Sequence, residues 1–173
     1  MKKRLSFLGA ITLLGTSTTS LVACNNIPQY NEDELQQLKQ ENQICTNCKE
    51  IKEKLEWIAP QEKPFNTVDN KYYYVVWRGD KNDDWRIAKF KNDKSPLINI
   101  DSFNNRWVLT YDIGFASKDM DLFIENQTGI VKDMVNWRKD KGNYFKAVYR
   151  WNLDTNEPNL IIDDNGNVKV NGE

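Results

Sequence analysis

The chain contains no histidine among its 173 residues, and this absence excludes several kinds of chemistry at once. Without an imidazole there is no Ser-His-Asp or Cys-His catalytic group, no histidine-ligated metal site and no histidine-based pH switch. Apolar residues are also few, at 39 % of the chain with a mean hydropathy of −0.73, which excludes a protein with several membrane spans. Aromatic residues, in contrast, make up 12 % of the chain and include six Trp, enough bulky apolar material for a core.

The amino terminus has the segment order of an export signal. Residues 2–4 are basic, residues 5–14 form a short apolar run, and residues 17–20 are small and polar. The run is too short for a stable membrane-spanning helix, which needs about 20 residues. The next four residues resemble a bacterial lipobox, whose cysteine receives a diacylglyceryl group before cleavage: Leu21-Val22-Ala23-Cys24. The alternative interpretation is an ordinary secretory signal in which Cys24 is incidental.

We therefore expect residues 1–23 to be a lipoprotein signal peptide and Cys24 to carry the lipid that anchors the mature chain. The expected location is the extracellular face of the cell membrane, with the membrane as a partner through Cys24. Cleavage would leave 21 basic and 25 acidic residues, a net charge of −4. This mild acidity argues against a nucleic-acid partner.

A long helix is expected directly after a polar tether at residues 24–30. Asn31 and Glu34 have the spacing of an N-terminal capping box. No Pro or Gly occurs after them until Pro60, which ends the run. We expect residues 31–59 to form a helical stalk and residues 60–66 to form a linker.

Apolar residues recur every three or four positions in the second half of this segment, at Ile44, Cys48, Ile51, Leu55 and Ile58. This stripe covers about two heptads, fewer than an independent coiled coil normally has. Two interpretations stay open. Either the stripe packs on the chain's own domain, or the helix pairs with a partner helix through Ile44, Ile51, Leu55 and Ile58.

From residue 67 onward, alternating apolar side chains and turn residues are typical of β-structure, so we expect a β-rich ectodomain over residues 67–173. The expected strands are 72–78, 85–90, 106–113 and 144–151, with a hairpin of 160–162 and 168–170. Helical spacing of Ile130, Met134 and Trp137 predicts one short helix over 129–140. The expected fold class is α+β: a long amino-terminal helix followed by a small antiparallel β-sheet domain with one short helix.

Two parts of the sequence carry a resemblance to a known group. The leader, Met1 to Ala10 and then Thr18 to Cys24, resembles surface lipoproteins of wall-less bacteria of the spiroplasma type. Residues 72–78 and 142–152 are similar to an uncharacterised family of such proteins, and the resemblance extends to phage-derived regions of those genomes. The family brings no known activity, so the resemblance implies only that Cys24 is lipidated.

Cys45 and Cys48 form a C-x-x-C pair, which has several interpretations. A redox-active pair normally follows a strand and opens a helix, whereas the apolar periodicity places this pair within the expected helix. A local or intermolecular disulfide is a second interpretation, and two idle or buried thiols are a third. No histidine or further free cysteine is left to complete a zinc site, so we expect no metal.

Every arginine of the mature chain adjoins a Trp in the sequence. Because neighbouring side chains of a strand point to opposite faces, each Trp can enter the core while its Arg faces water. The alternative is an exposed aromatic binding surface that stacks on sugars, formed by Trp77, Trp85, Trp107 and Trp151.

These patterns favour a lipid-anchored cell-surface protein with a structural or adhesion-like interaction role, without catalysis or a cofactor. Its expected partner is a protein or glycan at the surface. A first alternative is a solute-binding lipoprotein of a transporter, although the mature chain is short for a two-lobed receptor. A second is a thiol-disulfide oxidoreductase that uses Cys45 and Cys48.

Overall fold

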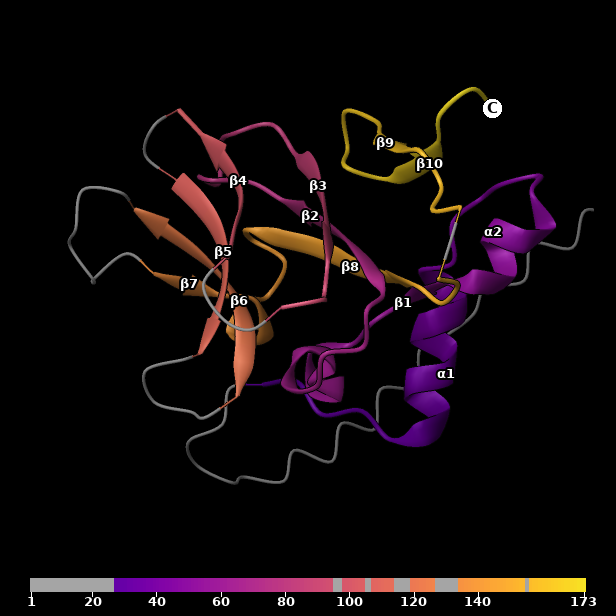
Figure 1. The fold of residues 1–173 in the computed structure, drawn as a ribbon, viewed down its shortest axis with the longest axis horizontal. Helices are drawn as coiled ribbons and strands as arrows, with labels where there is room; N and C mark the ends of the chain where they lie inside the picture. The colour runs from indigo at the N-terminus through magenta and orange to yellow at the C-terminus, as the bar shows by residue number, and fades with distance from the viewer. Residues whose placement is uncertain (1–26, 95–97, 105–106, 114–118, 127–133, 155) are drawn as a thin grey trace, which may run out of the picture.

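Two four-stranded antiparallel sheets face each other, and two short helices and a hairpin lie on the outer side of the first sheet (Figure 1). The computed structural model describes residues 27–94, 98–104, 107–113, 119–126, 134–154 and 156–173. For residues 98, 107–113 and 126 only the backbone is described.

The first sheet has the strand order β1-β8-β2-β3. Its strands are β1 (Leu55–Trp57), β8 (Phe145–Trp151), β2 (Tyr72–Trp77) and β3 (Arg86–Lys91). The second sheet consists, in order, of β4 (Ile98–Phe103), β5 (Trp107–Ile113), β6 (Met120–Asn126) and β7 (Val135–Asn136). A separate hairpin pairs β9 (Leu160–Ile162) with β10 (Val168–Val170). The helical elements are α1 (Glu32–Glu41), α2 (Lys49–Lys54) and the 3-10 turns η1 (Pro60–Glu62), η2 (Pro64–Asn66) and η4 (Trp137–Lys139).

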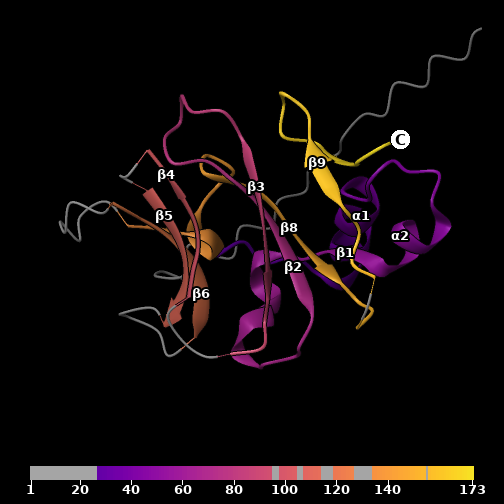
Figure 2. The same cartoon turned by 45° about the horizontal axis from the view of Figure 1, so that its top comes forward.

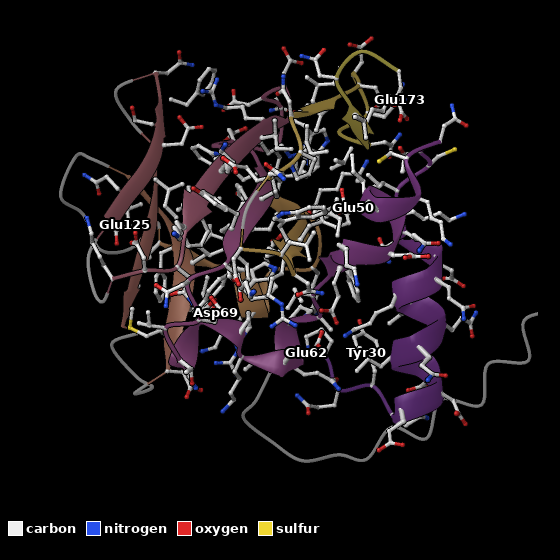
Figure 3. All side chains as sticks on the ribbon, turned by 45° about the vertical axis from the view of Figure 1, so that its right-hand side comes forward. Tyr30, Glu50, Glu62, Asp69, Glu125 and Glu173 are labelled. Atoms are coloured by element: carbon white, nitrogen blue, oxygen red, sulfur yellow. The ribbon has the colours of Figure 1, made fainter. Side chains whose placement is uncertain are left out.

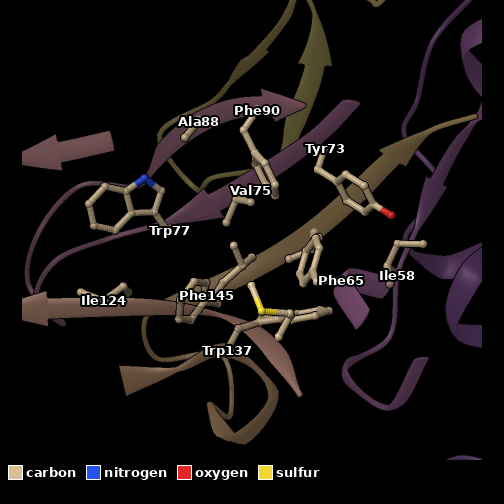
Figure 4. Packing of buried hydrophobic residues seen from close by; sticks show 13 residues of the cluster. Ile58, Phe65, Tyr73, Val75, Trp77, Ala88, Phe90, Ile124, Trp137 and Phe145 are labelled. Atoms are coloured by element: carbon tan, nitrogen blue, oxygen red, sulfur yellow. The ribbon is translucent and has the colours of Figure 1, made fainter. Parts of the chain in front are cut away.

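Strand β2 is apolar on both faces because both faces are covered. Tyr73, Val75 and Trp77 point toward the second sheet and join the core between the sheets (Figure 4). Tyr74 and Val76 point the other way, into a second core under α2 and the hairpin. The run from Tyr72 to Trp77 is therefore the central layer of a three-layer structure (Figure 2).

The prediction of a long amino-terminal helix over residues 31–59 is wrong. The predicted α+β class is wrong with it, because the described chain is mostly β-sheet with short helices. The capping box is confirmed, since the Asn31 side chain accepts from Glu34 N and the Glu34 carboxylate accepts from Asn31 N. Helix α1 nevertheless ends at Glu41. After α2 the chain becomes strand β1, because β8 offers a sheet edge that pairs with it from Leu55 to Trp57.

The prediction of a short helix over 129–140 is also wrong for residues 134–140, the part of this range that the structure describes. Val135 and Asn136 form β7 beside β6, and residues 137–139 form a 3-10 turn. Residues 127–133 lie outside the described structure. The predicted strands 72–78, 85–90, 106–113 and 144–151 and the terminal hairpin are confirmed within one residue at each end. In the part of the chain that the structure describes, no helix is long and apolar enough to cross a membrane.

Candidate functional site

A cleft of about 400 Å³ opens beside the first half of β8, where β8 extends beyond the end of β1. The last residue pair of these two strands is Trp57 with Tyr149, and Ile58 N then donates to Val148 O at 2.9 Å. The chain leaves the sheet at Pro60, so residues 145–147 border an open space on this side. The lining comprises Pro28, Tyr30, Trp57, Ile58, Pro60, Trp137, Asp140, Lys141, Gly142, Phe145, Lys146, Ala147 and Val148.

The amino-terminal segment forms one wall of the cleft. The Gln61 side chain accepts a hydrogen bond from Tyr30 N and donates one to Tyr30 O at 3.0 Å. This two-point contact fixes Tyr30 beside η1, the turn that carries Glu62 (Figure 3). Tyr30 and Trp57 are both half-buried, and Trp57 also packs against the core under α2 and the hairpin.

The η4 turn and the loop that follows it contribute another wall, through Trp137, Asp140, Lys141 and Gly142. One oxygen of Asp140 accepts backbone hydrogen bonds from Gly142 at 3.1 Å, Tyr144 at 3.0 Å and Phe145 at 2.9 Å. Gly142 has a φ of 82°, a conformation that L side chains rarely adopt. The Asp140 carboxylate thus holds the loop in its conformation through these three hydrogen bonds.

Two lysines line the cleft. Lys141 is exposed, and it forms no ion pair with a described residue. Lys146 also lines the cleft, but its ammonium group bonds the carbonyl oxygen of Asn165. Aromatic walls with a cationic rim can hold an anionic or amphipathic ligand by stacking and charge.

Next to this site, a partly buried ion-pair cluster secures η1 and η2 to the second sheet. Asp119 Oδ2 lies 2.9 Å from Lys63 Nζ and 2.8 Å from Arg138 Nη1, and its other oxygen accepts from Asn66 Nδ2 at 2.9 Å. Hydrogen bonds from Lys63 and then Arg138 hold the pKa of Asp119 well below its ordinary value. The Arg138 side chain is only 6 % exposed, so this contact is structural.

The four Trp of the expected binding surface do not form one surface. Trp77 and Trp151 are 0 % and 1 % exposed, which corrects their assignment because buried rings cannot stack on an external sugar. Trp77 instead donates from Nε1 to Asp101 at 3.2 Å. The side chain of Trp107 lies outside the described part.

Trp85 is half-buried between other groups of this chain. The Arg78 guanidinium lies 4.3 Å from its ring centroid, and the Lys146 ammonium lies 5.9 Å away. On the hairpin side the indole meets Gly166. Trp85 therefore joins the turn after β2 to the β9–β10 hairpin.

Trp151 and Arg150 obey the expected alternation, with the Trp in the core and the Arg side chain 31 % exposed. Arg150 is more than a solvated charge, however. Its Nη2 lies 2.7 Å from Glu56 Oε2, which ties β8 to β1.

The proposed partner-helix stripe is turned inward. Ile44, Ile51, Leu55 and Ile58 are all buried within this chain, at most 9 % exposed. They are therefore not available to a partner helix. The first of the two interpretations of the stripe, packing on the chain's own domain, is the one that the structure supports.

The C-x-x-C pair lies before and at the start of α2 rather than within a helix. Cys48 is the N-cap residue of this six-residue helix, and its backbone N–H bonds the Thr46 hydroxyl at 3.0 Å. Cys45 is exposed, Cys48 is half-buried, and both thiols are free. Cys24, the expected lipidation site, lies outside the described residues. Among the described residues, no group of three or more metal-ligating side chains is present.

The sequence patterns did not indicate the cleft. Its lining comes from the amino-terminal segment, the end of β1, the loop after η4 and the start of β8. Only the turn-type sequence Asp140-Lys141-Gly142-Asn143 marks one of these segments locally.

Comparison with known proteins gives one relative of unknown function. The chain is 25 % identical over 125 residues, 69 % of its length, to an uncharacterised protein, ORF1, of Spiroplasma virus SpV1-R8A2 B. The match spans 16 % of that viral protein. No protein-family model and no solved structure matches the chain. The chain is thus similar to a part of a spiroplasma virus protein, compatible with a phage-associated protein of the spiroplasma type.

Proposed function

We propose that this protein is a lipid-anchored cell-surface protein with an adhesion-like interaction role, belonging to the spiroplasma-type surface lipoproteins. The observation that carries the proposal is the sequence Leu21-Val22-Ala23-Cys24, which resembles a bacterial lipobox and follows a basic and then an apolar segment. Two acyl chains on one cysteine anchor a protein stably, whereas a single chain does not. The β domain would then be attached to the membrane through Cys24.

One feature supports an interaction role over a catalytic one. The carboxylate with the strongly lowered pKa, Asp119, has structural partners inside the chain, Lys63 and Arg138.

Labelling cells with a tagged fatty acid tests the proposal. The unmodified chain should incorporate the label, and Cys24→Ser should abolish incorporation and block cleavage, because only the thiol accepts the diacylglyceryl group. The double variant Cys45→Ser/Cys48→Ser is the matched control and should be labelled like the parent. Equal labelling of Cys24→Ser would contradict the proposal.

Solute binding is a second candidate function, favoured by the cleft. Its volume of about 400 Å³ falls within the range of small-molecule sites. If the cleft holds a solute, a matching sugar, nucleoside or amino acid should raise the Tm of the mature chain, and Trp57→Ala should remove that effect. The oxidoreductase alternative stays a prediction without such support, since no strand precedes Cys45 in the described chain.

A further inference from the structure

Helix α1 and the segment before it contact the domain without entering either of its cores. α1 has no buried residue, and no residue from 27 to 43 belongs to one of the two core clusters. Its two leucines, Leu35 and Leu38, are only half-buried. Ile44 is the first buried residue of the described chain, so the apolar core begins after the helix. Residues 27–41 are called the strap below.

Polar contacts with one short turn hold both ends of the strap. Before the helix, the backbone of Tyr30 is bound by the side-chain amide of Gln61. In the last turn of the helix, Lys39 Nζ lies 2.7 Å from Glu62 Oε1 and 2.6 Å from Glu56 Oε1. Gln61 and Glu62 are neighbours in η1, and Figure 3 shows Tyr30 and Glu62 close together. Two adjacent residues of η1 therefore hold the two ends of the strap.

Release of Lys39 leaves both of its carboxylates with a partner. Glu56 keeps the Arg150 guanidinium, whose Nη2 lies 2.7 Å from Glu56 Oε2. Glu62 keeps the hydrogen bond that Ala59 N donates to its Oε2 at 2.7 Å. The freed ammonium group is hydrated. An ion pair whose members stay paired or hydrated after it breaks can open at low cost.

The helix depends on this docking, whereas the chain after it is fixed independently. A helix of ten residues is marginal in water by itself, even with its capping box. Elements with few buried apolar contacts open at lower free energy than the whole domain. After the helix, Gln43 Nε2 donates to Lys52 O at 2.9 Å, and the Tyr149 hydroxyl donates to Asn42 O at 3.0 Å. The strap can therefore leave while the chain from residue 42 onward stays in place.

We propose that the strap docks on the domain and leaves it as one unit, and that the contacts of Lys39 with Glu56 and Glu62 are the latch. Pro28 and Tyr30 line the cleft, so undocking removes one wall of the cleft. A ligand that contacts these two residues binds only the docked form. Its binding would therefore shift the strap toward that form.

Undocking also changes the reach of the anchored domain, a consequence that rests on the proposed function. Pro28 comes four residues after Cys24, and Ile44 comes twenty residues after it. Fully extended, these lengths span at most about 14 Å and about 70 Å. With the strap docked the domain is held close to its lipid, and with the strap released it can extend away from the membrane.

Hydrogen exchange of the full chain with Cys24→Ser, read by mass spectrometry, tests the strap without any lipid. We expect protection factors of the α1 amides about 100-fold or more below those of β8, because α1 opens locally. Lys39→Gln should lower the α1 protection about fivefold further, and Glu62→Gln about threefold. Lys and Gln have similar helix propensities, and Glu62 lies outside α1, so both variants report on the latch rather than on the helix itself.

Two further variants test the unit and the specificity. Gln61→Ala should also lower the α1 protection, although its contact with Tyr30 precedes the helix, if the strap moves as one unit. Lys49→Gln is the matched control, because its ion pair with Glu53 lies on α2 and its side chain is 87 % exposed. It should leave the α1 protection unchanged.

Three results would overturn the inference: α1 amides as protected as those of β8, no effect of Lys39→Gln and Glu62→Gln on α1, or an equal effect of Lys49→Gln. Unchanged α1 protection in Gln61→Ala would overturn the claim that the strap moves as one unit. Failure of the proposed function is seen separately, as equal fatty-acid labelling of the parent and of Cys24→Ser in cells. That failure removes the change in reach and leaves the exchange results as they are.

Discussion

An ideal Cβ on Gly166 would lie 2.7 Å from Cγ of Trp85, so the turn between β9 and β10 packs directly on the indole ring. No real Cβ tolerates this distance, and the φ of Gly166 is 74°. Only glycine allows the hairpin to close over Trp85. The hairpin in turn covers the second core through Leu160 and Val168.

Gly166→Ala should therefore destabilise the protein by about 2 to 4 kcal/mol, from positive-φ strain plus overpacking against Trp85. Gly142→Ala isolates the first contribution, because Gly142 has a φ of 82° but nothing within 4 Å of its Cβ position. Its cost should be about 1 kcal/mol. Urea unfolding of both variants measures the difference, and equal losses would show that the Trp85 contact is unimportant.

Trp151→Ala should cost about 3 to 5 kcal/mol, because a fully buried indole leaves a large cavity in the second core. Arg150→Ala should cost less, about 1 to 2 kcal/mol, through loss of the partly exposed hydrogen bonds to Glu56 and Asn152. Thermal and urea unfolding compare the two. A Trp151→Ala protein that unfolds like the parent would contradict the assignment of this residue to the core.

Asp121 should make stability depend on pH. Burial raises the pKa of Asp121 from 3.8 to about 7, although Leu122 N and Asn136 Nδ2 donate to its carboxylate. Because the folded pKa is the higher one, folding takes up a proton between about pH 4 and about pH 7. This contribution to stability is complete below that window and is lost as the pH rises through it, by at most about 4 kcal/mol.

Asp121→Asn removes this titration at nearly constant shape. Unfolding free energies measured across the window should fall with pH in the parent relative to the variant. The same slope in both proteins would show that Asp121 ionises normally in the fold.

Asp119→Asn should destabilise the protein by about 2 kcal/mol, because it leaves the buried Arg138 guanidinium without its counter-charge. The pKa of Asp119 is lowered in the fold, whereas that of Asp121 is raised. The contribution of Asp119 to stability is therefore present above about pH 4 and is lost as the pH falls. Asp154→Asn is the control, since its carboxylate pairs with Lys71 at a surface position and is 81 % exposed. Its Tm should match that of the parent, and an equal loss in both variants would contradict the account.

The sequence predicted which residues are buried better than it predicted the elements that bury them. The stripe of Ile44, Ile51, Leu55 and Ile58 is buried throughout, as an apolar period requires. Its helical spacing nevertheless ends in strand β1, because pairing with β8 replaces the helical hydrogen bonds after Lys54. A tertiary partner that is remote in the sequence overrode the local pattern.

Strands β2 and β8 were predictable because their apolar runs are long and bounded by turn residues. Strands β4 and β6 were not recognised, since Ile98–Phe103 and Met120–Asn126 place charged residues inside the strands. Asp121 is one of these, and its burial depends on Asn136 of a neighbouring strand. The cleft could not be predicted at all, because it exists only where β1 ends before β8.

Mass spectrometry of the amino-terminal peptide from native membranes tests the central claim most directly, namely that the domain is held at the surface by a lipid on Cys24. We expect a peptide that begins at Cys24 and carries a thioether-linked diacylglyceryl group. A peptide in which Ala23 is still joined to Cys24, or one that begins elsewhere and has a free thiol at Cys24, would contradict the account.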